Sequence, residues 1–143
     1  MVQRECMIDV LKDDVEGTTT IGEYIDKFNL CDEMMIRTKN RVHPGWSTVS
    51  STRKSSCKEF TCIQLANEQI FICTPTQDVF EVKKNQYKKA NAIRKGDILQ
   101  HTDASELRVD KTYEMNCEEI ADVYALVTSD NKPYYINNIL VRA

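Results

Sequence analysis

The carboxyl-terminal segment is the part of the sequence that most constrains the fold. Its last twenty-one residues read VYALVTSDNKPYYINNILVRA. Three apolar runs, Val123–Val127, Tyr134–Ile136 and Ile139–Val141, are separated by the polar stretches Ser129–Pro133 and Asn137–Asn138. Short apolar runs between turn-forming residues are typical of β-strands, so the segment predicts three strands joined by two turns. Chain ends are usually frayed and polar. We therefore expect this apolar end to lie in the core.

The rest of the sequence repeats this pattern of short apolar runs and turns. Strands spaced by roughly ten residues, with one short helix, are typical of an all-β sandwich or a closed β assembly. A turn is predicted at His43–Trp46, a hairpin turn at Ala66–Glu68 and a polar linker at Arg53–Ser56. The further strands are predicted at Met7–Leu11, Glu33–Arg37, Trp46–Thr52, Glu59–Leu65, Gln69–Cys73 and Val79–Val82.

One segment, Thr20–Phe28, has the spacing of a helix. Thr20 is placed to cap its amino-terminal end, and Glu23, three residues later, completes the pattern of a capping box. The apolar residues recur at intervals of three and four, which puts them on one helical face. They are Ile21, Tyr24, Ile25 and Phe28.

Length and composition set broad limits on function. A chain of 143 residues predicts one domain spanning residues 1–143, and a monomer is the simplest expectation. The net charge of −3 does not favour nucleic acid, and no apolar run approaches the ~20 residues that a transmembrane helix needs. The first residues lack the features of a secretory signal, so a cytoplasmic location is expected.

The cysteine and lysine patterns favour structural interpretations. Six cysteines lie at irregular spacing without a CxxC motif, and only two histidines are present, so no metal site is expected. Cys6, Cys73 and Cys117 are interpreted as thiols packed in the core. The lysines between residues 83 and 95 form a local basic cluster, which is interpreted as a solvated face because few aromatic residues are interleaved with it.

Four separated blocks of the sequence resemble those of the intein family, the self-splicing members of the Hint (Hedgehog/intein) fold. Glu5–Ile8 is similar to the family's Asp-Thr-x-Ile, which places Met1 at the position of the first reacting residue. Thr74–Gln77 falls where the family has Thr-x-x-His, and Ala92–Asp97 where it has Ala-x-x-Leu-x-x-Gly-Asp. The last twenty-one residues resemble the closing blocks, which include Val-Tyr-Asp-Leu and a terminal Ile-Leu-Val-His-Asn.

The resemblance implies a horseshoe-shaped, all-β Hint fold with one or two short helices and no bound cofactor. It also implies autocatalytic protein splicing: an N-to-S or N-to-O acyl shift, a transesterification and an Asn cyclisation. The partners would be flanking host-protein segments (exteins) in cis, or the other half of a split intein. Only about twenty-five residues separate Asp97 from Val123, so no endonuclease domain is inserted and the chain resembles a mini-intein.

The same resemblance assigns roles to six positions. Met1 stands at the nucleophile, Thr74 and Gln77 at the Thr and His that support it, and Ala143 at the terminal Asn that cyclises. Lys132 and Arg142 stand where the family has two further His residues. A seventh position, Ala125, usually holds Asp.

Most of these positions depart from the family pattern. Met1 has no nucleophilic heteroatom and Ala143 cannot cyclise. Gln77 hydrogen-bonds but cannot act as an acid or base near neutral pH, and the Arg142 guanidinium stays protonated. Thr74 alone among them is retained. The sequence as given is therefore expected not to splice.

Two origins are consistent with these departures. In the first, a divergent intein has had its two ends disabled, because Met1 and Ala143 are the changes that would silence splicing. In the second, the chain is a degenerate Hint-like domain with a non-catalytic binding or structural role. Under either origin, Gln77 and Lys132 are also compatible with ordinary turn residues, and Arg142 with a simple ion pair, for example to Asp122 or Asp130.

Overall fold

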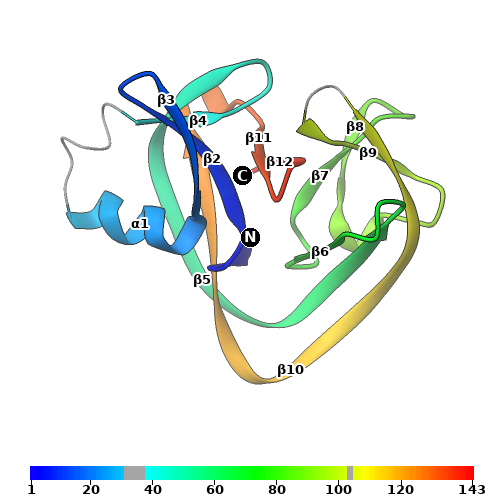
Figure 1. The fold of residues 1–143 in the computed structure, drawn as a ribbon. Helices are drawn as coiled ribbons and strands as arrows, with labels where there is room; N and C mark the ends of the chain where they lie inside the picture. Colours follow the sequence, from blue (N-terminus) through cyan, green and yellow to red (C-terminus); the bar gives the residue numbers. More distant parts are fainter. Residues whose placement is uncertain (31–37, 103–104) are drawn as a thin grey trace.

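The computed structural model describes residues 1–30, 38–102 and 105–143. Within these ranges it is built almost entirely of β-strands, with one α-helix (Figure 1). In chain order, the elements are β1 (Val2–Gln3), β2 (Met7–Lys12), β3 (Val15–Thr20), α1 (Ile21–Leu30), β4 (Thr38–Arg41), β5 (Trp46–Leu65), β6 (Ile70–Cys73), β7 (Asp78–Glu81), β8 (Gln86–Lys89), the 3₁₀ turn η1 (Ala90–Ala92), β9 (Ile98–Gln100), β10 (Glu106–Thr128), the 3₁₀ turn η3 (Ser129–Asn131), β11 (Tyr134–Ile136) and β12 (Ile139–Arg142).

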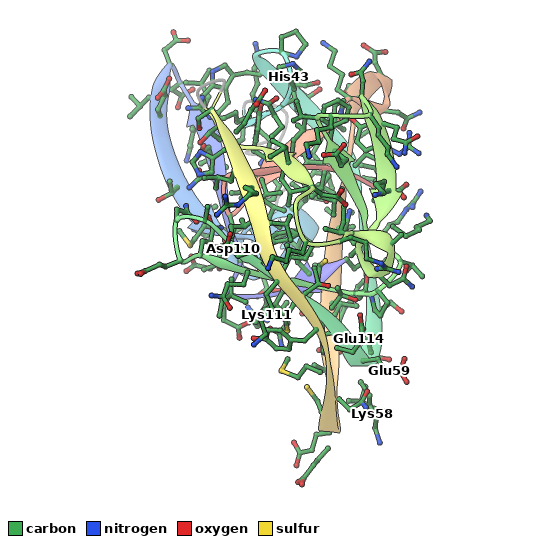
Figure 2. The ribbon with its side chains drawn as sticks, turned by 90° about the vertical axis from the view of Figure 1, so that its right-hand side faces the viewer. His43, Lys58, Glu59, Asp110, Lys111 and Glu114 are labelled. Atoms are coloured by element: carbon green, nitrogen blue, oxygen red, sulfur yellow. The ribbon has the colours of Figure 1, made fainter. Side chains whose placement is uncertain are left out.

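Two long strands, β5 and β10, run through both arms of the horseshoe. They pair antiparallel along most of their length, and the register shifts between the pairs Asn116↔Glu59 and Ala121↔Cys57. Such a shift bends a ribbon and increases its twist, and both strands curve from one arm of the molecule into the other (Figure 1). Figure 2 shows Lys58 and Glu59 near this bend, at the opposite end of the molecule from His43.

The shorter strands extend this ribbon on both sides. The sheet runs in the order β11-β12-β7-β9-β10-β5-β4-β2-β3, while β1 pairs with β10, β6 with β5 and β8 with β7. Every one of these pairings is antiparallel. The predicted all-β fold with a horseshoe shape is confirmed.

The prediction of a polar linker at Arg53–Ser56 was wrong. These residues lie inside β5, paired with Ala125, Tyr124, Val123 and Asp122 of β10. The polar sequence obscured the strand because this part of the ribbon is solvated, and the backbone hydrogen bonds come from a partner distant in sequence. Lys54 also lies over the Tyr124 ring, 5.8 Å from its centroid. Trp46–Thr52 and Glu59–Leu65 are therefore parts of one strand.

Helix α1 forms as the sequence predicts. The Glu23 backbone N–H donates to Thr20 Oγ1 at 3.2 Å, which is the expected cap. The Glu23 carboxylate accepts from the Thr19 hydroxyl instead of reaching back to the Thr20 backbone, so the capping box is incomplete. Ile21, Tyr24 and Ile25 are buried against the sheet, with Phe28 partly buried beside them.

The carboxyl-terminal segment forms the end of β10, at residues 123–127, and then two short strands in the core. β11 pairs with β12, and β12 pairs with β7 through Val141↔Val79 and Arg142↔Asp78. Tyr134 is 2% exposed, and Ile136, Ile139 and Val141 are fully buried. The predicted strands here are confirmed. The strand predicted at Glu33–Arg37 lies outside the described residues.

Candidate functional site

Both ends of the chain meet at the turn between β6 and β7. This turn is Thr74–Gln77, closed by a hydrogen bond from the Gln77 N–H to the Thr74 carbonyl oxygen. The Thr74 N–H donates to the Met1 carbonyl oxygen at 2.8 Å, and Met1 leads directly into β1. Figure 1 places the N and C labels between the two arms of the horseshoe.

Thr74 and Gln77 together hold the amino nitrogen of Met1. That nitrogen donates to Thr74 Oγ1 at 2.9 Å and to Gln77 Oε1 at 2.5 Å. Burial lowers the pKa of the Met1 amino group below its ordinary value, since a charged amine is costly to remove from water. The resemblance assigns Thr74 and Gln77 to the amino-terminal junction. Both contact the Met1 nitrogen, which would form the peptide bond to any preceding residue.

Gln77 also reaches the other end of the chain. Its Nε2 donates to the Arg142 carbonyl oxygen at 2.7 Å and to the Asp78 carbonyl oxygen at 3.0 Å. The Gln77 side chain is buried, with 4% of the residue exposed. Since an amide has an acceptor at one atom and two donors at the other, one side chain links Met1 to the residue preceding Ala143.

The Arg142 side chain is anchored on β7 and β8. Its Nε donates to Asp78 Oδ2 at 3.0 Å, and its guanidinium lies 4.2 Å from the centroid of the Tyr87 ring. Lys89 Nζ lies 2.9 Å from the other carboxylate oxygen of Asp78. An ion pair was one of the two expectations for Arg142, but Asp78 is the partner, and Asp122 pairs with Lys54 instead.

A cleft of about 730 Å³ surrounds the two chain ends. Ala125 lines it from β10, with Arg53 opposite on β5, and Ala125 is the position where the family usually has Asp. The methyl group of Ala125 offers no hydrogen-bond acceptor at the position where the family's Asp would place a carboxylate. The other lining residues include Met1, Ser55, Cys57, Glu59, Thr74, Gln77, Asp78, Lys89, Asn91, Arg142 and Ala143.

Lys132 does not join this cluster. It follows the turn η3, and its carbonyl oxygen accepts from Thr128 Oγ1 at 2.5 Å. Its side chain is not among those that line the cleft. Five of the six site residues expected from the sequence therefore come together, and Lys132 lies apart from them.

The buried thiols near the site are packed rather than exposed. Burial raises the pKa of Cys6 to about 11 and that of Cys73 to about 12. Both cysteines belong to the hydrophobic core, as the sequence predicted. The same prediction for Cys117 was wrong, because this residue of β10 is partly exposed. Cys57 is different, because it is partly exposed and lines the cleft, where its thiol donates to the Glu59 carbonyl oxygen at 2.8 Å.

Asp78, Tyr87 and Lys89 are site residues that the sequence interpretation missed. Asp78 follows Gln77 directly, but nothing in the sequence pairs it with Arg142, 64 positions away. Lys89 was interpreted as part of a solvated basic cluster. Its side chain is indeed 56% exposed, and its ammonium group also pairs with the Asp78 carboxylate.

Neither a metal-binding cluster nor a membrane-spanning helix is found in the described part of the chain. Across residues 1–30, 38–102 and 105–143, no group of three or more His, Cys, Asp or Glu side chains is arranged to hold a metal ion. Within those same ranges, no helix is both long and apolar enough to cross a membrane.

Comparison with known proteins places the fold. No family model and no curated protein sequence matches the chain. Among solved structures, it is similar to the transcription factor IIB Mvu mini-intein, with a TM-score of 0.83 and 14% identity over 99% of this chain and 98% of that one. It is also similar to the VidaL intein, with a TM-score of 0.80 and 15% identity over 99% and 95%.

A third similarity is to a bacterial intein-like domain from Clostridium thermocellum. The TM-score is 0.74 and the identity 16%, over 100% of this chain and 99% of that one. These alignments cover nearly the whole length of both partners, so no inserted endonuclease domain separates this chain from the mini-inteins. The chain therefore has the fold of the inteins, in the compact form that lacks an endonuclease.

Proposed function

We propose that this domain is an intein-type protein-splicing domain whose two reacting groups are missing from the present sequence. The observation that carries the proposal is the pair of contacts made by Gln77: its Oε1 accepts from the Met1 nitrogen and its Nε2 donates to the Arg142 carbonyl oxygen. Splicing needs both junctions in one preorganised site, because positioning two chain ends removes a large entropic barrier.

The amino-terminal reaction would use the Met1 position. With Cys there, its sulfur would attack the carbonyl carbon of the preceding residue and the C–N bond would break, leaving a thioester and a free amine. Thr74 and Gln77 would orient that nitrogen, since they already contact it. Gln77 is neutral and cannot transfer a proton in the way a His does, so this step would be slower than in an intein with His at position 77.

The carboxyl-terminal reaction would use position 143. A nucleophile in the segment after 143 would take the acyl group from the thioester. With Asn at 143, its side-chain nitrogen would then attack its own carbonyl carbon and break the bond to the following segment. The partners are accordingly the two flanking segments of a host protein in cis. A split-intein partner is the alternative arrangement.

The test restores both reacting groups in one precursor. Met1→Cys and Ala143→Asn are combined, short foreign sequences flank the domain, and a Cys follows position 143. Intact mass spectrometry over several hours at pH 6 to 9 is expected to detect a ligated product, or cleavage at one junction with added thiol. If the restored precursor stays whole at every pH, the domain is a non-catalytic Hint-like module instead.

Two variants of the restored precursor sharpen that test. Gln77→His supplies the missing acid and is expected to accelerate amino-terminal cleavage by about 10²-fold, a typical contribution of general acid catalysis. Thr74→Ala removes a donor-acceptor group from the Met1 nitrogen and is expected to slow the same step. A matched substitution at Thr112, on β10 away from the cleft, serves as the control.

A further inference from the structure

We propose that Asp78 and Tyr87 are positioning residues for the carboxyl-terminal junction, acting on it through the side chain of Arg142. The inference rests on the proposed splicing function and adds to it two residues that the family pattern does not supply. It also assigns Arg142 the role of an anchor in place of a proton shuttle.

Arg142 is the last residue of β12, so no strand residue after it helps to hold it in place. Its pairing with Asp78 is the last register position between β12 and β7. The Arg142 side chain is 49% exposed, and a long exposed side chain at a strand end ordinarily samples many rotamers. Here two groups hold it: a carboxylate on β7 that contacts Nε, and an aromatic ring on β8 that the guanidinium lies over.

Asp78 supplies the first hold. Its carboxylate accepts from Arg142 Nε at 3.0 Å, while its other oxygen lies 2.9 Å from Lys89 Nζ. The Asp78 side chain is only 15% exposed. Although its burial raises the pKa of the carboxyl, hydrogen bonds from Lys89 and Arg142 lower it overall below the ordinary value. Because donor and acceptor both carry a charge, each of these hydrogen bonds is stronger than one between neutral groups.

Tyr87 supplies the second hold. Its ring faces the guanidinium at 4.2 Å, a distance suited to a cation–π contact. The ring is itself fixed, because Tyr87 pairs with Phe80 across β7 and β8 and packs against it edge to face at 5.3 Å. Tyr87 is therefore a preformed surface on which the Arg142 guanidinium rests.

These contacts fix the junction when they are combined with that of Gln77. Gln77 holds the Arg142 carbonyl oxygen, which belongs to the peptide bond between residues 142 and 143. Asp78 and Tyr87 hold the side chain of the same residue. Two independent attachments to one residue restrict rotation of that peptide unit, which is the geometry an attack by a side chain at 143 requires. The guanidinium stays protonated and its Nε is engaged by Asp78, so it does not carry protons.

The first experiment uses the chain as it is. The Arg142 Nε–H resonance is expected to be shifted upfield by the Tyr87 ring current and protected from exchange by Asp78. Tyr87→Phe keeps the shift and Tyr87→Leu loses it, while Asp78→Asn loses the protection. Tyr113→Leu removes another tyrosine ring that faces a cation, in this case Lys111, and is expected to leave the Arg142 signal in place. An Arg142 signal without an upfield shift, or unchanged in both Tyr87→Leu and Asp78→Asn, overturns the inference.

The second experiment measures the junction itself. In an Ala143→Asn precursor, Asp78→Asn is expected to slow carboxyl-terminal cleavage about tenfold, the effect of losing one charge-assisted hydrogen bond. Asp78→Glu is expected to restore part of that rate. Asp122→Asn, which breaks the exposed pair with Lys54, is the control and is expected to have no effect.

A structural defect and a positioning defect are separated by the other junction. In Met1→Cys precursors, thiol-induced amino-terminal cleavage is expected to fall much less than carboxyl-terminal cleavage when Asp78 is changed. Equal losses at both junctions, or no loss at either, overturn the positioning role. If no Ala143→Asn precursor cleaves at all, the proposed splicing function fails, and the Arg142 resonance still decides whether the anchor exists.

Discussion

The side-chain amide of Gln77 donates to the backbone carbonyl oxygen of Arg142 over 2.7 Å, although 65 positions separate the two residues. The same amide accepts from the Met1 nitrogen through its oxygen. One buried side chain thus ties the first residue of the chain to the second-last.

Removing the Gln77 amide is expected to destabilise the fold. Gln77→Ala leaves the Arg142 carbonyl oxygen and the Met1 nitrogen without this partner, and the loss is expected to be about 1–3 kcal/mol. Urea unfolding followed by circular dichroism measures it. Gln86→Ala, at an exposed position on β8, is the matched control and is expected to change stability by less than about 0.5 kcal/mol. Equal effects of the two substitutions would contradict the bridge.

The amino group of Met1 is expected to titrate below its ordinary pKa of 8.0. Burial disfavours the charged form in the folded chain, so the unfolded chain binds more protons between the two pKa values. Stability is therefore expected to rise with pH through that window and to level off above the unfolded value. Nuclear magnetic resonance titration of the Met1 amine measures the folded pKa. An unshifted pKa would show that the nitrogen is open to water.

Thiol reactivity is expected to divide the cysteines into two groups. Burial raises the pKa of Cys6 to about 11 and that of Cys73 to about 12, so both are almost entirely protonated at pH 8. Cys57 and Cys117 are partly exposed and are expected to react first with iodoacetamide. Peptide mass mapping over time in the folded protein gives the order. Urea-unfolded protein, in which all should react at similar rates, is the control.

Glu81 is expected to be important for the arm that carries the site. Its fully buried carboxylate accepts from the backbone N–H groups of Lys84 at 2.8 Å and Ile98 at 2.7 Å. Glu81→Ala leaves both donors unpaired and is expected to cost about 2–5 kcal/mol, measured by chemical unfolding. Glu81→Gln retains one acceptor and is expected to cost less. If the two variants were equally stable, the carboxylate would not be acting as this double acceptor.

Local patterns predicted the elements that depend on local interactions. Helix α1 follows from the cap at Thr20 and from the spacing of Ile21, Tyr24 and Ile25, all of which act within a few residues. The two carboxyl-terminal strands follow from apolar runs bounded by Asn137–Asn138. The long strands were harder, because Arg53–Ser56 is polar and becomes strand only by pairing with residues of β10.

The site residues that lie in the family blocks were predicted from the sequence. Those that belong to the site only through contacts with residues distant in sequence were missed. Thr74 and Gln77 were located by their position in the turn, and the structure adds that both contact Met1. Asp78 and Tyr87 have no signal of their own, because their importance arises only from the arrival of Arg142. Lys132 matched the family spacing, yet the η3 turn carries it away from the cleft.

The bridge at Gln77 has a consequence for any polypeptide that continues beyond Met1 and Ala143. Segments attached at these two points leave the domain side by side. A host could accommodate the whole domain within a single surface turn, because the insertion would not force its flanking strands to separate. The host would then fold around the insertion much as it folds around a short loop, and the splicing proposed above would leave its backbone with little distance to close.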